Sequence, residues 1–224
     1  MLCFEMIMKT NKFILISLFQ FFSISAYAQL TQKQLDSLVK VFTTVLKQRA
    51  VDTICVYKQY CIGCLFQATK GSNLCAENYA SLPTYIFWKE KGKTFVTRKD
   101  ICFDYSTQLL PSDSIWYFYF NNQEKIKKES LKIPQYAEIV NGKKIIQTVK
   151  IDHSIFFHIT VSTLAGSITK EINSFYLTRE LGINEVLNIN YEYNNSTGLN
   201  NLHQIIQRII KHDSVKQKFV RTLR

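Results

Sequence analysis

Short turns between β-rich segments constrain the fold of this chain more than any other feature of its sequence. Asn141-Gly142 separates Ile139-Val140 from Ile145-Ile146, and Asn-Gly between apolar segments is the strongest short-range signal for a two-residue hairpin turn. Lys91-Gly92 divides residues 84–97, which are rich in aromatic and β-branched residues, in the same way. Strands joined by such short turns pair antiparallel, because a parallel connection needs a crossover of a dozen or more residues.

Other segments extend this β pattern. Further strands are predicted at residues 53–57, 155–161, 172–178 and 186–193, from β-branched enrichment or from alternation of apolar and polar residues. The Asn/Ser/Gly-rich residues 194–201 are predicted to be a loop. Residues 111–132 are ambiguous, because their apolar positions follow helical spacing while residues 115–120 alone also fit a buried strand.

Two helices are predicted near the ends of the chain. Residues 31–49 begin with a capping box, Thr31 to Gln34, and continue with one apolar stripe. Residues 202–210 carry a second apolar stripe, and the helix continues or restarts from Ser214 towards Leu223. The predicted fold class is therefore α+β, a single antiparallel sheet of about five to seven strands with an N-terminal and a C-terminal helix packed on it.

The N-terminus reads as a secretory signal. Two lysines precede an apolar run over residues 13–24, and Ala26-Tyr27-Ala28 offers the small residues that signal peptidase requires. This run is too short for a membrane span, which needs roughly 20 residues. We expect cleavage after residue 28, with Met1 or Met8 as the start, and one α+β domain over residues 29–224. The mature chain is expected to have no transmembrane span and to be periplasmic, on the cell surface or extracellular.

The chain is strongly basic. Its formal net charge is +11 at pH 7, and the first 28 residues hold only two of its 28 Lys and Arg residues and one of its 17 Asp and Glu residues. The excess is concentrated at the C-terminus, opposed there only by Asp213, and it consists of Arg208, Lys211, Lys216, Lys218, Arg221 and Arg224. A basic amphipathic helix suits an anionic surface or a partner protein. Nucleic acid is not an expected partner, because single-strand binding would place several aromatic residues among these charges.

The predicted mature chain contains five cysteines: Cys55, Cys61, Cys64, Cys75 and Cys102. An exported chain favours structural disulfides, so all five are disulfide candidates. Their number is odd, which leaves at least one without a partner inside the chain. The sequence does not choose among the possible pairings. A zinc site from four of them lacks the second close-spaced ligand pair, so neither a metal nor another cofactor is expected.

Cys61-Ile62-Gly63-Cys64 also suggests thiol-disulfide exchange. A Cys-x-x-Cys pair after a strand, with Leu82-Pro83-Thr84 further on, resembles the thioredoxin family. The resemblance implies that Cys61 is the nucleophile, Cys64 the resolving thiol and Pro83 a cis-proline. Only 18 residues separate Cys64 from Pro83, too few for the helix, strand and connections that this family places there. A redox role for Cys61 and Cys64 therefore implies another scaffold.

No other catalytic constellation stands out. His153 and His158 would point to opposite faces of one strand, and His203 and His212 are poorly aligned on one helix. The sequence lacks a nucleophile elbow, a His-Glu-x-x-His motif and a glycine-rich phosphate loop. We therefore expect an exported, non-catalytic binding or accessory module whose basic surface contacts an anionic envelope component or another protein. The alternative is the thiol-disulfide redox protein, and the sequence does not indicate the oligomeric state.

Overall fold

The structure is a computed structural model, and it describes residues 32–62, 82–100, 103–182, 186–211 and 221–223. A helix over residues 32–48 comes first. The chain then forms β1 (Thr53–Ile62), β2 (Thr84–Glu90), β3 (Lys93–Lys99), β4 (Phe103–Tyr105), β5 (Gln108–Leu109) and α2 (Ser114–Lys128). The remaining elements are β6 (Gln135–Val140), β7 (Lys143–Thr148), β8 (Ser154–Thr163), β9 (Gly166–Asn173), the 3-10 helix η1 (Ser174–Leu177), β10 (Glu180–Leu181), β11 (Val186–Leu187), α3 (Tyr191–Ser196), α4 (Gly198–Lys211) and β12 (Arg221–Leu223).

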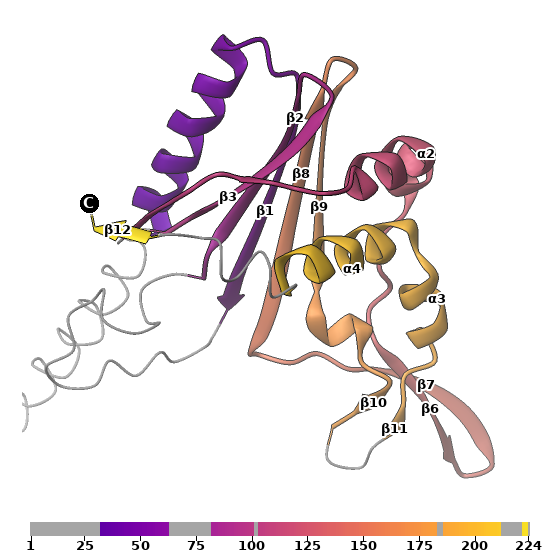
Figure 1. Cartoon of the computed structure of the whole chain (residues 1–224). Helices are drawn as coiled ribbons and strands as arrows, with labels where there is room; N and C mark the ends of the chain where they lie inside the picture. Colours follow the sequence, from indigo (N-terminus) through magenta and orange to yellow (C-terminus); the bar gives the residue numbers. More distant parts are fainter. Residues whose placement is uncertain (1–31, 63–81, 101–102, 183–185, 212–220, 224) are drawn as a thin grey trace, which may run out of the picture.

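One antiparallel sheet organises these elements (Figure 1). Seven strands lie in the order β12-β4-β3-β2-β1-β8-β9, and β5 pairs with β3 beside them. Every described strand pair is antiparallel. The predicted α+β class with an antiparallel sheet is confirmed. Its seven-strand path agrees with the predicted five to seven strands, but the prediction of a single sheet is wrong, because β6–β7 and β10–β11 form separate two-stranded sheets. The sequence did not indicate β4, β5 and β12, because these strands have only two or three residues, too few to show alternation.

Both hairpin predictions from glycine-containing turns are confirmed. Asn141 and Gly142 have φ values of 52° and 74°, and Lys91 and Gly92 have 50° and 74°. Positive φ at both central residues is the geometry of the two-residue turn that matches strand twist. Asn and Gly tolerate it best, so Asn141-Gly142 suits both positions of its turn, whereas Lys91-Gly92 has a favourable residue only at the second position.

Side chains of the central strands alternate between two apolar clusters on opposite faces. On one face Ile54 and Ile86 pack with Leu46 of helix 32–48, and the ring of Phe42 lies 5.5 Å from that of Trp88. On the other face the cluster joins strand residues to α2 and α4, and it includes Cys55, Tyr57, Phe87, Ile115, Trp116, Leu199, Leu202 and Ile206. Successive strand residues point to opposite faces, so β1 and β2 contribute to both clusters.

The ambiguous segment 111–132 contains a helix, α2, and not a strand. Ile115, Trp116 and Tyr119 bury its inner side. Its C-terminus is held by Lys170 of β9, whose Nζ donates to the carbonyl oxygens of Lys127 at 2.8 Å and Glu129 at 2.7 Å. A cation at a helix C-terminus also complements the helix dipole.

The strand predictions for the last third of the chain are partly wrong. Residues 172–178 leave β9 at Asn173, whose side chain accepts a hydrogen bond from the backbone N–H of Phe175 and starts η1. Of residues 186–193, only Val186 and Leu187 are in a strand. The predicted loop 194–201 lies almost entirely in α3 and α4. Side chains of Asn that bind nearby backbone groups favour such turns and helix starts over a continued strand.

The C-terminal helix prediction is also limited. Helix α4 ends at Lys211, and Arg221–Leu223 form strand β12 instead of continuing a helix. These residues pair with β4, with Leu223 opposite Phe103. Residues 212–220 lie outside the described part of the chain, as does the predicted signal segment 1–28. Within the described ranges, no helix is long and apolar enough to cross a membrane.

Asn194 joins three separate segments: α3, the segment before β6 and the 3-10 helix η1. Its side chain is fully buried, and its Nδ2 donates to the carbonyl oxygens of Lys132 at 2.8 Å and Tyr176 at 2.7 Å. Its Oδ1 accepts from the backbone N–H of Lys132 at 2.8 Å. Buried polar groups carry a large penalty when they lose their partners, so this asparagine fixes how α3 meets the segment before β6.

We predict that Asn194→Ala lowers the free energy of unfolding by about 2–4 kcal/mol, because backbone groups of Lys132 and Tyr176 lose their partners inside the protein. Urea denaturation followed by circular dichroism measures the change. The control is Asn201→Ala, since Asn201 is exposed on α4, and its effect should stay within about 0.5 kcal/mol. Equal midpoints for the two variants would show that the Asn194 contacts contribute nothing.

Candidate functional site

The structure places two of the five cysteine candidates. Cys55 lies inside β1, fully buried and free, so as a disulfide candidate it is a wrong prediction. Burial raises the pKa of its thiol to about 12, which keeps it protonated and unreactive. Cys61 lies near the end of β1, partly exposed and opposite Ile155 of β8. Cys64, Cys75 and Cys102 lie outside the described residues.

The arrangement around Cys61 differs from the thioredoxin analogy. Cys61 is part of a strand that is hydrogen-bonded on the β8 side, whereas the analogy requires it at the start of a helix. Pro83 does immediately precede a strand, β2, but the described residues contain no cis peptide bond. The segment between Ile62 and Leu82 is outside the described range, so the partner thiol Cys64 is not placed.

A buried histidine that the sequence did not single out lies between α4 and the sheet. His203 packs on the ring of Phe157, with ring centroids 4.4 Å apart, and its Nδ1 lies 3.1 Å from the hydroxyl of Tyr57. That hydroxyl also accepts a hydrogen bond from Nε2 of Gln207. The Tyr57 hydroxyl has one proton and two lone pairs, so it satisfies His203 in either tautomer of the imidazole.

His203 is held neutral inside the protein. Burial, with a smaller effect from Lys211, lowers its pKa to about 4. Burial likewise raises the pKa of Tyr57. A buried pair that does not ionise at neutral pH orients the helix on the sheet but does not offer a proton to a substrate. The only signal in the sequence was the spacing of His203 and Gln207 by four residues, which places both on one helix face.

The predicted anionic-binding residues are only partly placed. Arg208 and Lys211 lie in the last turn of α4 and are exposed. Three residues apart, they are neighbours on the helix surface, and no salt bridge joins either to an acid among the described residues. Lys216, Lys218 and Arg224 lie outside the described part, and for Arg221 only its backbone, in β12, is described.

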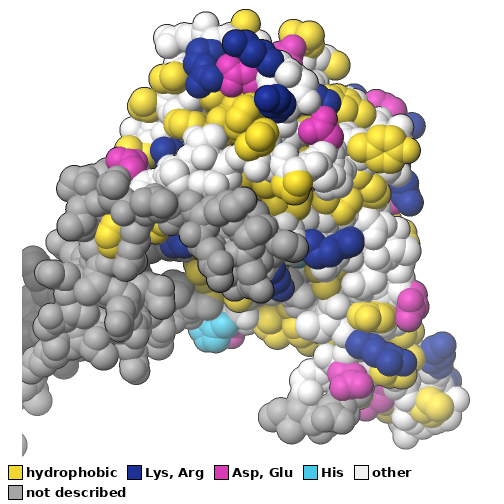
Figure 2. Space-filling view, in the orientation of Figure 1, with side chains coloured by type: hydrophobic (Ala, Val, Ile, Leu, Met, Phe, Trp, Pro, Cys, Tyr) yellow, Lys and Arg dark blue, Asp and Glu magenta, His cyan; other side chains and the backbone are white. Residues whose placement is uncertain are grey.

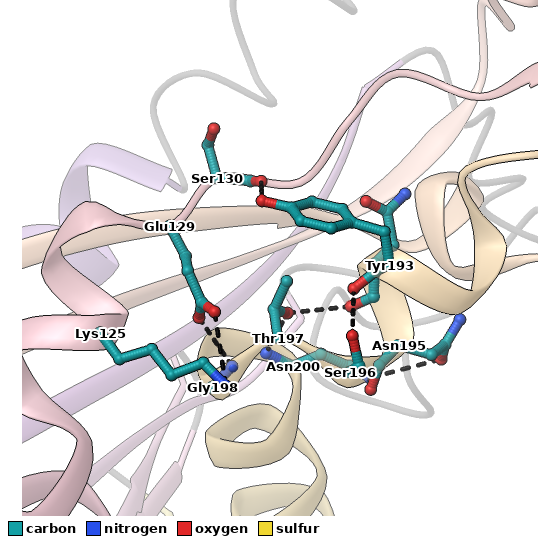
Figure 3. A network of polar contacts seen from close by, with 10 residues as sticks. Lys125, Glu129, Ser130, Tyr193, Asn195, Ser196, Thr197, Gly198 and Asn200 are labelled. Carbon is teal, nitrogen blue, oxygen red and sulfur yellow. Dashed lines mark hydrogen bonds and ion pairs between the residues drawn. The ribbon is translucent and has the colours of Figure 1, made fainter.

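At the N-terminus of α4, backbone N–H groups are already hydrogen-bonded to side chains of the protein (Figure 3). The backbone N–H of Gly198 donates to Oε2 of Glu129 at 2.7 Å, and the N–H of Asn200 donates to Oγ1 of Thr197 at 3.1 Å. Nζ of Lys125 lies 3.6 Å from the same glutamate. Glu129 takes the position that a bound anion would take at a helix N-terminus, so this end of α4 is a structural joint between α2 and α4.

No group of three or more His, Cys, Asp or Glu side chains within the described ranges is arranged to hold a metal ion. No protein-family model, curated protein or solved structure was found to match the chain.

We predict that acidification destabilises the protein through His203. The unfolded chain binds a proton near pH 6.5 and the folded chain only near pH 4, so this contribution to stability is complete above pH 6.5 and is lost as the pH falls towards 4. The expected loss is about 3 kcal/mol. Urea denaturation across this range measures it, with His203→Gln as the comparison.

The variant removes the buried titrating group while leaving the other three histidines in place. Its free energy of unfolding should fall less steeply between pH 6.5 and 4 than that of the parent protein. Parallel curves for the two proteins would contradict the neutral buried state of His203.

Proposed function

We propose that this chain is an exported, non-catalytic binding or accessory protein whose basic surface contacts an anionic component of the cell envelope. The proposal is supported mainly by the exposed side chains of Arg208 and Lys211 at the C-terminal end of α4. The chain beyond them adds four more cations, Lys216, Lys218, Arg221 and Arg224. The signal-like N-terminus supports export.

The fold supports a binding role for this end of the helix. We propose a single domain after residue 28, in which the N-terminal and C-terminal helices pack on opposite faces of the sheet. Leu199, Leu202 and Ile206 bury the inner side of α4, so its basic residues are left at the surface. Exposed cations attract anions most strongly at low ionic strength, where the screening length is long.

A direct test is binding of the exported protein to immobilised polyphosphate at low salt. The double variant Arg208→Gln/Lys211→Gln should bind about tenfold more weakly, since two unpaired charges are lost from one surface. The matched control is Lys40→Gln/Lys47→Gln, which removes the same charge from exposed positions of helix 32–48. If both double variants weaken polyphosphate binding equally, the binding depends on net charge and not on the end of α4. Absence of binding by the parent protein would contradict the proposal.

The cysteines support a second candidate function. With Cys55 buried and free, the four remaining cysteines of the mature chain form an even set, which we propose forms two disulfides. If one of these is Cys61–Cys64, the short loop it closes is the arrangement that redox proteins use. Cys61 is partly exposed at the end of β1, where another thiol can reach it.

Thiol counting with an alkylating reagent and mass spectrometry distinguishes the two candidates. The exported protein should show no reactive thiol when native, one when unfolded, which is Cys55, and five after full reduction. Bridges that resist mild reductant fit a structural role. A Cys61–Cys64 bridge that mild reductant opens selectively would favour the redox function, and two or more thiols in the unfolded, unreduced protein would contradict the proposed pairing.

A further inference from the structure

The β6–β7 hairpin projects from the rest of the chain (Figure 1). All of its residues from Ala137 to Thr148 are exposed. The strands pair only with each other among the described residues. An isolated two-stranded hairpin in water is marginally stable at best. Its sequence nevertheless places four aliphatic residues next to the turn, and Ile139 leaves 78% of its surface exposed.

The register distributes these aliphatic residues over both faces. Ile139 pairs with Lys144, and Ala137 pairs with Ile146, so Ile139, Lys144 and Ile146 share one face. Val140 pairs with Lys143, and Glu138 pairs with Ile145, so Val140, Lys143 and Ile145 share the other. Each face therefore carries two exposed aliphatic side chains and one lysine. Figure 2 shows hydrophobic, basic and acidic side chains at this lower end of the molecule.

We infer that this hairpin tip inserts into the interface of an anionic lipid bilayer. A rigid protein partner covers one face or one edge of a hairpin and leaves the opposite face exposed to solvent. The headgroup region of a bilayer surrounds the tip, so apolar side chains on both faces leave water together. Lys143 and Lys144 directly follow the turn, opposed on the hairpin only by Glu138, which complements anionic headgroups.

The backbone limits how deeply the tip enters. In the described structure the outer edges of β6 and β7 have no neighbouring strand, and unpaired N–H and C=O groups are costly in hydrocarbon. The two lysines also stay with the headgroups, since their side chains reach towards the polar region. The tip therefore lies at the boundary between headgroups and acyl chains and does not span the membrane.

The base of the hairpin is fixed to the protein. The backbone N–H of Ile189 donates to the carbonyl oxygen of Gln135 at 2.8 Å, and Nδ2 of Asn190 donates to that of Ile133 at 2.8 Å. The N–H of Val149 donates to the carbonyl oxygen of Pro134 at 3.0 Å. A hairpin anchored at its base and free at its tip holds its side chains in a defined orientation, which reduces the ordering cost of binding.

The inference rests on the proposed contact with the envelope but names a different surface from α4. The test uses vesicles of equal parts phosphatidylglycerol and phosphatidylcholine, and the exported protein with Ile139→Trp. Its fluorescence should shift to the blue and be quenched by lipids brominated on their acyl chains. The matched control is Leu164→Trp, because Leu164 is 87% exposed at the turn between β8 and β9, a hairpin without lysines beside its turn. That tryptophan should not be quenched.

Binding by vesicle co-sedimentation gives the second measurement. The variant Ile139→Thr/Ile145→Thr keeps β-branched shapes and removes apolar surface from both faces, and it should bind about tenfold more weakly. The variant Lys143→Gln/Lys144→Gln should lose binding to anionic vesicles to a similar extent. Circular dichroism and the urea midpoint establish that both variants are folded.

Several outcomes would overturn the inference. One is that the parent protein stays in the supernatant when anionic vesicles are sedimented. Another is that the tryptophans at positions 139 and 164 are quenched equally. A third is that Arg208→Gln/Lys211→Gln abolishes vesicle binding while both hairpin variants keep it, a result that would leave the proposal for α4 intact. A fourth is that the parent protein binds no vesicles but self-associates in sedimentation velocity, and that Ile139→Thr/Ile145→Thr abolishes this self-association. The partner of the hairpin tip would then be a second copy of the protein.

Discussion

Burial of β1 on both faces is the interaction on which the rest of the structure depends. Ile54 faces the cluster under helix 32–48, while Cys55 and Tyr57 face the cluster under α2 and α4. The strand also lies between β2 and β8 in the sheet, so its backbone is hydrogen-bonded on two sides. Each fully buried apolar side chain contributes roughly 1.5–3 kcal/mol, and β1 concentrates several of them at one place. The helices are thereby positioned with their polar sides outward.

This arrangement explains why candidate binding features lie at the margins of the protein. Two buried polar groups have partners within the protein: the Tyr57 hydroxyl contacts His203 and Gln207, and the Asn194 side chain bonds Lys132 and Tyr176. Groups satisfied in this way hold elements together and have little capacity left for a ligand. The exposed charge of Arg208 and Lys211 and the projecting aliphatic residues of the β6–β7 tip are two features of the described residues that packing does not use.

Local signals in the sequence predicted those parts of the fold that local geometry decides. Asn141-Gly142 and Lys91-Gly92 predicted their hairpins because positive φ is restricted to few residue types. Helix 32–48 lies within the predicted helix 31–49 because its apolar stripe is uninterrupted. The prediction of a strand over 186–193 is wrong beyond Leu187, because Asn188 accepts hydrogen bonds from the backbone N–H groups of Gln135 and Asn190, and alternation alone does not reveal these partners. Short strands such as β12 depend on the neighbouring strand and leave no pattern of their own.

The candidate site was predictable only in part, for the same reason. The run of cations after residue 207 is visible in the sequence, but the structure shows which side of α4 is buried and leaves Arg208 and Lys211 exposed. The burial of Cys55 depends on α2 and α4, which cover it, so the residues around Cys55 in the sequence do not distinguish it from the other cysteines. The apolar tip at Ile139 appears as a normal strand in the sequence, and only the structure shows that no element covers it.

Hydrogen–deuterium exchange of the protein, with and without vesicles containing phosphatidylglycerol, tests the central claim most directly. Proposed contact surfaces should gain protection while the core remains unchanged, because binding slows exchange where it orders or covers backbone amides. Protection is predicted around residues 137–148 and at the end of α4 near Lys211, with none at the β8–β9 turn around Leu164. No change at either surface, or equal protection at that turn, would contradict the account.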